Sequence, residues 1–462
     1  MPVGQESDDG AIMKKIITYG SYDLFHEGHY RILQRAKALG DYLIVGVTTE
    51  HFDRQRGKLN LVDSIMTRIE NVKRTGFADE IIVEDHEGQK IEDIQKYGID
   101  TFVLGSDWTG KFDYLKQYCN VVYLERTPNI SSTYIREGRV SLVKLGIVGT
   151  GRIAKRFTSE VKFVSGIEPV AAFNPDKESL KEFADTYFVE AFSDDFDAFL
   201  SKVDAIYVAS PNETHADYVR RALAAEKHVL CEKPMTFTYA EAVELYALAK
   251  TNQVVLMEGI RAAYLPGFQQ LLSVARDGTI GEICDIEACF TRIGVPGSRD
   301  MTDAKYSGAF MEYGSYTLLP IFKLFGLEYE DMQIDSILGE NGIDIFTKIQ
   351  FRYKNGLATA KTGAGVKSEG QLVISGTKGY ILAQSPWWLI RSFDVRYEDP
   401  DKVDHHEAGF VGSDGFRYEI AEFMTKINKT GGRDYKLTRQ ESIAMAKVVE
   451  KFMDIRRKQQ GF

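Results

Sequence analysis

The 462-residue chain has few cysteines, no excess of positive charge and no long apolar run. A membrane-spanning helix needs about 20 consecutive apolar residues, and no stretch approaches that length, so we expect no membrane partner. The four cysteines, at 119, 231, 284 and 289, have neither the spacing of zinc ligands nor the density of a disulfide scaffold. Reduced thiols in a cytoplasmic protein are therefore expected.

A formal net charge of -10 argues against a nucleic-acid surface, because such surfaces are basic. Small-molecule substrates are the expected partners. The first residues, MPVGQESDDG, lack the basic and apolar regions of a secretory signal, and we expect residues 1–12 to form a disordered tail. The length exceeds that of a usual single domain, which predicts several domains.

Two stretches open in the same way, with a β-branched strand, a glycine-bearing turn and a helix. The first starts at KKIITYG (14–20) and the second at VKLGIVGTGRIA (143–154). In each, strands then alternate with helices, as in a parallel α/β domain. After about residue 262 the strands alternate apolar and polar residues, which predicts a mostly antiparallel open sheet with one covered face. The predicted α/β class thus comprises a Rossmann-like domain (13–140), a dinucleotide-binding Rossmann domain (141–262), and an α+β domain with C-terminal helices (263–462).

The first opening continues into the sequence HEGH, with His26 and His29 at a predicted helix start and Gly28 between them. Histidines there can stabilise charge on a phosphate, assisted by the helix dipole and free N–H groups. Two histidines three residues apart can also be solvated surface residues. The segment TYGSYDLFHEGHYRILQRAKALGDYLIVG resembles the glycerol-phosphate cytidylyltransferase family of HxGH nucleotidyltransferases, and the resemblance covers residues 14–138.

Further segments carry the same resemblance. RTPNISSTYIRE (126–137) resembles the family's RTxGISTT element, with Asn129 for glycine and Ser132 for threonine, and GSDWTGKFDYLK resembles its GxDW segment. The resemblance implies transfer of CMP from CTP to a phosphate, with Mg²⁺ bound by phosphate oxygens. Residue spacing alone leaves ATP open as the nucleotide.

The resemblance also implies individual roles in this domain. Catalysis falls to His26, His29, Lys58 and Arg126. Nucleotide binding falls to Tyr19, Gly20, Gly28, Asp107, Ser131, Ser132 and Thr133, and substrate binding to Asp23 and Arg68.

The GTGRIA sequence follows a predicted strand and opens a helix, as a dinucleotide fingerprint requires. Gly149 makes the turn and Gly151 admits the pyrophosphate. The next strand ends at Asn174, where NAD enzymes carry a carboxylate for the ribose 2′-hydroxyl. The missing carboxylate favours NADP, with Lys177 as a candidate phosphate contact, whereas Asp176 leaves NAD open.

Three segments, SPNETH (210–215), HVLCEKP (228–234) and MEGIRAAYLP (257–266), resemble successive elements of the glucose-fructose oxidoreductase, inositol dehydrogenase and MocA superfamily. ISGTKGYI and GFRYEIAEF are most similar to its dihydrodiol-dehydrogenase-like branch. The resemblance places Lys233 beside the nicotinamide, with Tyr316 of GAFMEYGSY as its catalytic partner. A lysine can shuttle a proton if burial and nearby positive charge lower its pKa.

The same resemblance implies the remaining roles. Cofactor binding falls to Gly149, Gly151, Arg152, Ile153, Asn174, Ser210, Pro211, Asn212, His215 and Glu232. Glu312, where aspartate is commoner, and Arg261 are substrate-binding candidates, and a structural ion pair is the alternative for Arg261. No metal site is expected.

The two resemblances, and their fusion in one chain, imply a bifunctional enzyme that makes a CDP-polyol for envelope glycans. The second half would reduce a keto- or aldo-sugar phosphate to a glycerol-phosphate-like or ribitol-phosphate-like product, which the first half would couple to CMP. Two alternatives stay open: the oxidoreductase half acts on a CDP-linked sugar, or it is a non-catalytic cofactor-sensing or scaffold domain. Relatives of both halves pair, so a homo-oligomer is expected.

Overall fold

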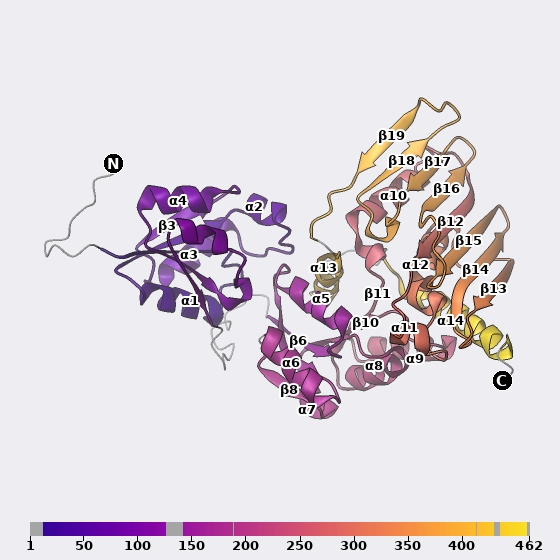
Figure 1. Ribbon diagram of the computed structural model, residues 1–462, viewed down its shortest axis with the longest axis horizontal. Helices are drawn as coiled ribbons and strands as arrows, with labels where there is room; N and C mark the ends of the chain where they lie inside the picture. Colours follow the sequence, from indigo (N-terminus) through magenta and orange to yellow (C-terminus); the bar gives the residue numbers. More distant parts are fainter. Residues whose placement is uncertain (1–12, 126–141, 188, 413, 429–434, 460–462) are drawn as a thin grey trace. The chain divides into compact units, whose positions relative to one another are not determined.

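The computed structural model describes residues 13–125, 142–187, 189–412, 414–428 and 435–459 (Figure 1). The predicted tail (1–12) and the RTPNISSTYIRE element lie outside these residues. By compactness the chain divides into two units, which are described separately. The first contains a five-stranded sheet, and the second contains an eight-stranded sheet and most of a six-stranded sheet.

The five-stranded sheet is parallel, with strand order β3-β2-β1-β4-β5. Its strands are β1 (Lys15–Gly20), β2 (Tyr42–Thr48), β3 (Glu80–Glu84), β4 (Thr101–Gly105) and β5 (Asn120–Leu124). Neighbouring β1 residues enter opposite cores, because side chains alternate along a strand: Ile16 packs with α1 (Glu27–Lys37) and α3 (Ile65–Arg74), and Ile17 with α4 (Gln89–Tyr97). Burial on both faces explains the continuous apolar strands.

The strand order of this sheet reverses between β1 and β4, where α/β sheets leave a crevice at their carboxyl ends. Helix α1 starts directly after β1, with His26 as its N-cap. The short helix η1 (Ser106–Trp108) follows β4. The histidine motif and the GxDW segment therefore meet the same edge of the sheet.

The six-stranded sheet has the order β11-β10-β9-β6-β7-β8, and β6, β9, β10 and β11 are parallel. Its strands are β6 (Val143–Val148), β7 (Ile167–Phe173), β8 (Ala191–Ser193), β9 (Ala205–Val208), β10 (His228–Glu232) and β11 (Leu256–Gly259). The connecting helices include α5 (Arg152–Val161), α6 (Lys177–Tyr187), α7 (Phe196–Leu200), α8 (His215–Ala224) and α9 (Tyr239–Thr251). The predicted α/β alternation is confirmed.

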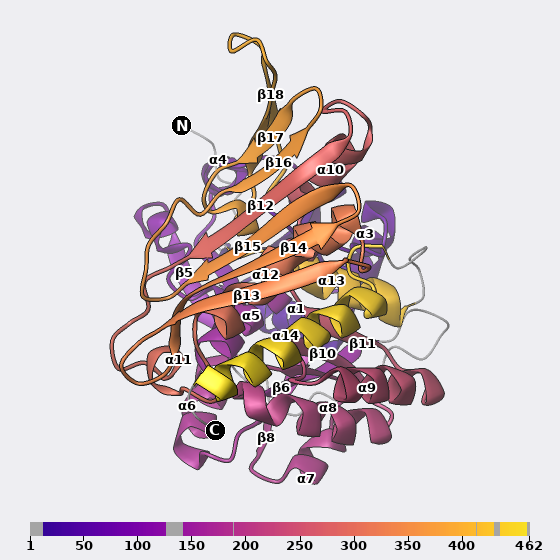
Figure 2. The ribbon, with the colours of Figure 1, turned by 90° about the vertical axis from the view of Figure 1, so that its right-hand side faces the viewer.

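The eight-stranded sheet, seen face-on in Figure 2, is antiparallel except for the parallel pair β12–β15. In spatial order its strands are β13 (Asp331–Leu338), β14 (Asp344–Tyr353), β15 (Gly356–Gly363), β12 (Ile283–Thr291), β16 (Leu372–Gly376), β17 (Tyr380–Ala383), β18 (Ser392–Arg396) and β19 (Val403–Glu407). Helix α12 (Ala309–Phe325) packs on β12, β14 and β15, and contacts α10 (Pro266–Arg276) and α14 (Arg439–Gln459). The predicted mostly antiparallel sheet is confirmed.

Two further elements of the second unit lie beyond the end of β11. The short helix η4 (Arg261–Tyr264) follows β11, and α13 (Phe416–Ile427) packs against it. Among the described residues, no helix is long and apolar enough to cross a membrane, and no group of three His, Cys, Asp or Glu side chains is arranged to hold a metal ion.

Candidate active sites

His26 and His29 lie together at the start of α1, with their rings stacked and the centroids 3.9 Å apart. The Gly28 N–H donates to His26 Nδ1 at 3.0 Å, so a proton on the neutral His26 ring belongs on Nε2. Burial lowers the pKa of His29 well below its ordinary value, and the neighbouring His26 and Lys58 lower it further. The His29 ring is therefore a neutral hydrogen-bonding group at neutral pH.

Gly28 is required by packing as well as by access. A Cβ at this position would lie 2.8 Å from His26 Cε1, closer than non-bonded carbon atoms approach. A side chain there would displace the His26 ring from its capping position.

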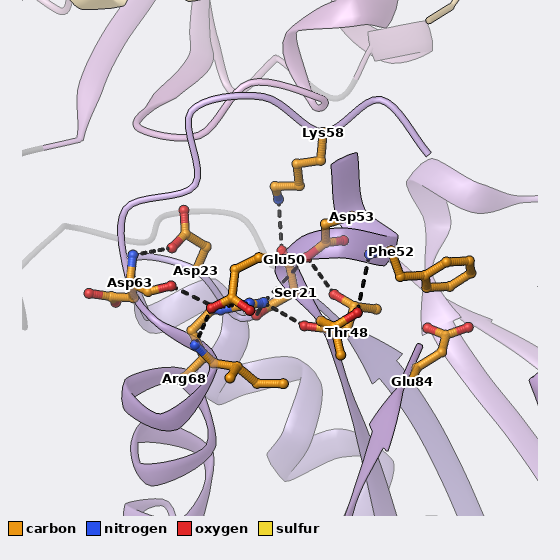
Figure 3. A network of polar contacts seen from close by, with 12 residues as sticks. Ser21, Asp23, Thr48, Glu50, Phe52, Asp53, Lys58, Asp63, Arg68 and Glu84 are labelled. Carbon is orange, nitrogen blue, oxygen red and sulfur yellow. Dashed lines mark hydrogen bonds and ion pairs between the residues drawn. The ribbon is translucent and has the colours of Figure 1, made fainter. Parts of the chain in front are cut away.

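Lys58 lies at the same edge of the sheet, and its Nζ donates to Ser21 Oγ at 2.8 Å (Figure 3). Burial lowers the pKa of Lys58, and two nearby carboxylates oppose that shift. Asp23 fixes the segment that follows Lys58, because its carboxylate accepts the N–H groups of Val62, at 3.2 Å, and Asp63, at 2.7 Å. The predicted substrate residue Asp23 thus holds the lysine-bearing loop against the end of β1.

Arg68 is fully buried and ties the ends of two strands to that loop (Figure 3). Its Nη1 donates to the carbonyls of Ser21, at 2.8 Å, and Thr48, at 2.9 Å, and lies 3.3 Å from Asp53 Oδ2. Its Nε donates to the Asp63 carbonyl at 3.1 Å. The predicted contact with a phosphate stays a prediction, and the observed contacts support a role in shaping the turn after β1.

The Tyr19 side chain does not join the histidines. It crosses Gly46 on β2, where an added Cβ would lie 2.2 Å from Tyr19 Cδ1, and its hydroxyl donates to Asp93 on α4 at 2.8 Å. Burial raises the pKa of Tyr19, and Asp93 raises it further. The structure therefore places this side chain in the core and leaves only the strand end at Gly20 facing the edge.

Of the remaining predicted residues of the first site, one is described by the structure and four are not. Asp107 is exposed on η1. Four lie outside the described residues, so their phosphate contacts stay predictions: Arg126, Ser131, Ser132 and Thr133.

The second unit contains a cleft of about 600 Å³ at the carboxyl ends of β6, β7, β9 and β10. All of the predicted cofactor-binding residues of this half line it: Gly149, Gly151, Arg152, Ile153, Asn174, Ser210, Pro211, Asn212, His215 and Glu232. Lys233 and Glu312 line it as well. The cleft therefore joins the glycine-rich turn to the proposed catalytic lysine.

The glycine-rich turn fits a dinucleotide. Gly149 has φ +93°, and a Cβ there would lie 2.6 Å from the Ala209 carbonyl oxygen, so only glycine is accommodated. A Cβ at Gly151 would meet no atom within 4 Å. That open space, at the start of α5, suits a pyrophosphate held by backbone N–H groups.

The side chains after β7 are already paired. Asn174 donates to Thr150 Oγ1 and accepts the Asp176 N–H at 3.0 Å. Asp176 caps α6 by accepting two backbone N–H groups of its first turn. Lys177 forms an ion pair with Asp194 at 2.9 Å. The nearest carboxylate is thus used as a helix cap, and Lys177 is paired with Asp194.

Lys233 lies against α12. Its Nζ donates to the Glu312 carbonyl at 2.9 Å and lies 3.6 Å from Glu312 Oε2. Burial lowers the pKa of Lys233, but Glu312, and after it Tyr316, Glu232 and Tyr313, raise it above its ordinary value. Nearby positive charge does not lower the pKa of Lys233, because its neighbours are two carboxyl groups and two phenols. Lys233 is therefore an ammonium group.

Tyr316 lies one helical turn beyond Glu312 and is buried. Its hydroxyl accepts a hydrogen bond from Arg261 Nε at 3.3 Å, while Arg261 Nη1 donates to the Asp414 carbonyl at 3.0 Å. The Arg261 guanidinium also stacks over the Phe416 ring at 4.4 Å. The contacts that Arg261 makes with the described residues point to a role in positioning Tyr316.

Sequence reasoning missed two residues of this site. Thr150, which receives the Asn174 hydrogen bond, lies inside the GTGRIA fingerprint and could have been found there. Tyr207 donates to Glu232 Oε1 at 2.6 Å from the buried strand β9. A buried tyrosine hydroxyl needs a partner, but nothing in the sequence identifies which one.

Residues 17–138 match the cytidylyltransferase-like family. Residues 143–260 match the oxidoreductase family with an NAD-binding Rossmann fold, and residues 268–382 match the GFO/IDH/MocA C-terminal domain. The chain belongs to both families. Because both are enzyme families, it is a cytidylyltransferase fused to an NAD(P)-dependent oxidoreductase, and the two predicted resemblances are confirmed.

Individual relatives cover each part. Glycerol-3-phosphate cytidylyltransferase of Bacillus spizizenii is 52% identical over 130 residues, which are 28% of this chain and 100% of that protein. The scyllo-inositol 2-dehydrogenase (NADP(+)) of Bacillus subtilis is 28% identical over 332 residues, 69% of this chain and 98% of that protein. A 3-ketoreductase from Actinomadura kijaniata, solved with NADP and TDP-benzene, has a TM-score of 0.58 at 22% identity, over 67% of this chain and 96% of its own, and shares the fold.

Proposed function

We propose that this enzyme makes a CDP-activated polyol in two steps: reduction of a keto- or aldo-sugar phosphate at the Lys233 site, and cytidylyl transfer to the resulting polyol phosphate at the His26–His29 site. The observation that carries the proposal is the presence of both sites in one chain. The 52% identical relative is named for glycerol 3-phosphate, which supports a polyol phosphate as acceptor. Glycerol 3-phosphate needs no dedicated reductase, so a less common polyol phosphate, such as one related to ribitol, is favoured.

In the cytidylyl transfer, an oxygen of the acceptor phosphate attacks the α-phosphorus of CTP in line. The bond to the β-phosphate oxygen breaks, and pyrophosphate leaves. His29, kept neutral by burial, and Lys58 would stabilise the negative charge that builds on the phosphates. The α1 N-terminus adds its dipole and free N–H groups. Mg²⁺ would enter bound to the triphosphate, because phosphoryl oxygens supply many of its ligands.

At the second site, a bound nicotinamide cofactor would supply hydride to the carbonyl carbon. The side chains hold the proton: the Lys233 ammonium is placed to donate it to the carbonyl oxygen, with Tyr316 as the alternative donor. The Arg261 N–H, 3.3 Å from the Tyr316 oxygen, would stabilise negative charge there after proton loss. NADP is favoured over NAD because Asp176 is used as a helix cap.

The decisive experiment measures oxidation of NADPH and release of pyrophosphate with candidate keto-sugar phosphates, with and without CTP. Reduction without CTP, followed by pyrophosphate release when CTP is added, supports the proposed order. Turnover of CDP-linked sugars alone would support reduction after activation. Cofactor binding without any turnover would support a sensing or scaffold role and contradict the proposal.

The proposed setting is the supply of envelope glycan precursors by a cytoplasmic homo-oligomer. Its partners would be CTP, the sugar phosphate and the cofactor. Sedimentation of the purified chain measures the oligomeric state, and a monomer at working concentration would contradict that part of the proposal.

A further inference from the structure

Two buried carboxyl groups lie behind the Lys233 end of the cleft. Glu232, on β10, lines the cleft and accepts the Tyr207 hydroxyl at 2.6 Å. Glu419, on α13, is fully buried, and both of its carboxyl oxygens lack a hydrogen-bond partner among the described residues. A buried carboxylate without a donor is costly. The mechanism proposed above leaves Glu419 without a role.

Titratable groups from three neighbouring elements interact electrostatically with Glu419. Glu232 approaches from β10, Tyr207 from β9 and Arg261 from η4. On β11 the backbone of Gly259 lies between the two: a Cβ there would lie 3.2 Å from Glu419 Oε1 and 3.5 Å from Glu232 Cα. The buried carboxyl group of Glu258, next along β11, also interacts electrostatically with Glu232. Burial raises the pKa of Glu419 well above its ordinary value, Glu232 raises it further, and Arg261 offsets part of the shift.

Arg261 does not neutralise Glu419 directly. Its guanidinium is held by the Tyr316 hydroxyl, the Asp414 carbonyl and the Phe416 ring, and within the described parts of the chain no ion pair joins it to Glu419. Near Arg261, Lys233 forms an ion pair with Glu312, and Asp414 forms one with Arg156 at 2.5 Å. Lys233 is thus paired with Glu312, and Arg261 is a single cation that interacts with both Glu232 and Glu419. One cation beside two buried carboxyl groups favours one negative charge, not two, on the pair.

We propose that Glu232 and Glu419 together hold one proton in the free enzyme and release it when an oxidised nicotinamide cofactor occupies the cleft. An oxidised nicotinamide ring carries a positive charge that the reduced ring lacks. A cation at the Glu232 end of the cleft stabilises the second negative charge of the pair. The protonated enzyme therefore binds the oxidised cofactor and releases one proton to solvent. The reduced cofactor binds without proton release.

The consequence for reduction is a proton store beside the donors. The pair can restore the proton that Lys233 or Tyr316 gives to the substrate oxygen, at the moment when the cofactor becomes positively charged. Glu419 touches neither substrate nor cofactor in this scheme and acts through Glu232, so it is a positioning residue. The inference rests on the cofactor site of the proposed function.

The test is calorimetric titration of the full chain with NADP⁺ and with NADPH, near neutral pH, in buffers of different ionisation enthalpy. We expect NADP⁺ binding to release up to one proton and NADPH binding to release none. The Kd for NADP⁺ should fall up to about tenfold per pH unit while the pair is protonated, and then level off. The Kd for NADPH should stay flat.

Variants assign the proton to the pair. Glu419→Gln, which is permanently uncharged, should abolish the release and flatten the NADP⁺ profile, whereas Glu419→Asp should restore both. The matched control is Glu422→Gln on the same helix, whose carboxylate pairs with Lys436 at 2.6 Å and whose loss should leave the release intact.

Three results would overturn the inference. If both nucleotides bind the unmodified enzyme without proton release, the pair does not hold the proton. If Glu419→Gln releases as much proton as the unmodified enzyme, another group is responsible. If neither nucleotide binds, the proposed cofactor site fails together with the inference. The comparison of NADP⁺ with NADPH needs no variant, so it decides the matter even if Glu419→Gln does not fold.

Discussion

Lys233 donates a hydrogen bond to the Glu312 backbone carbonyl at 2.9 Å, and the Glu312 carboxylate lies 3.6 Å from the same nitrogen. One residue of α12 thus both positions the lysine and supplies the negative charge that keeps it protonated. A proton donor with a raised pKa remains competent to higher pH.

Replacing Glu312 by Gln should therefore shift the pH dependence of reduction. Because the carboxylate raises the pKa of Lys233, its loss should move the basic limb of kcat/KM for NADPH oxidation down by on the order of one pH unit. The backbone hydrogen bond is retained in this variant. An unchanged basic limb would show that Lys233 is not the group that titrates there.

His29→Ala should separate the two activities. Removing one group that stabilises charge at a phosphate costs about 10²–10³ in turnover, so pyrophosphate release should fall by that factor while NADPH oxidation is unaffected. His86→Ala is the control, because His86 is an exposed histidine of the same sheet domain, paired with Asp85 and Glu92. Loss of both activities in a folded His29→Ala protein would contradict independent sites.

The cofactor cleft could be predicted from the sequence because its determinants are local. Glycines of a strand–turn–helix unit and the residues that end parallel strands converge at one edge of such a sheet, and Gly149, Asn174, Ser210 and Lys233 do line one cleft. The alternation of side chains along a strand assigns them to the two faces of the sheet, but it does not show which face binds a ligand. For that reason the Tyr19 side chain, which packs over Gly46, could not be placed.

Charge states could not be predicted, because they depend on contacts between distant segments. Lys233 and Glu312 are 79 residues apart, and the helix that carries Glu312 has to pack on the sheet before the carboxylate can act on the lysine. The burial of Arg68 by Ser21, Thr48 and Asp53 has the same origin. The sequence motifs identified Lys233 and Arg68 as candidates, but their neighbours and burial depend on how distant segments pack.

Arg68→Lys should destabilise the cytidylyltransferase domain. Lysine keeps the charge but cannot reproduce the fork that reaches Ser21, Thr48 and Asp63 together. Leaving buried acceptors unpaired costs about 1–3 kcal/mol each, so we expect a loss of several kcal/mol in urea unfolding followed by a probe within this domain. Arg74→Ala, on the same helix and exposed, breaks only the surface pair with Glu70 and should cost less than about 1 kcal/mol. Equal losses in the two variants would contradict this role for Arg68.

Glu258 should make the stability of the oxidoreductase half fall as pH rises. Burial raises the pKa of Glu258 from 4.5 to about 7, while its Oε1 accepts the Met235 N–H at 3.1 Å. A carboxyl group with a raised pKa contributes its full stability below pH 4.5 and loses it as pH rises through about 7.

The shift corresponds to about 3 kcal/mol, and Glu258→Gln should remove this pH dependence because glutamine does not ionise and keeps an oxygen for the Met235 N–H. Urea unfolding of both proteins on either side of the window, followed by a probe in this half, measures the difference. The variant should gain relative stability only at the alkaline end. A gain of equal size at both pH values would mean that Glu258 is not protonated in the folded enzyme at the acidic end.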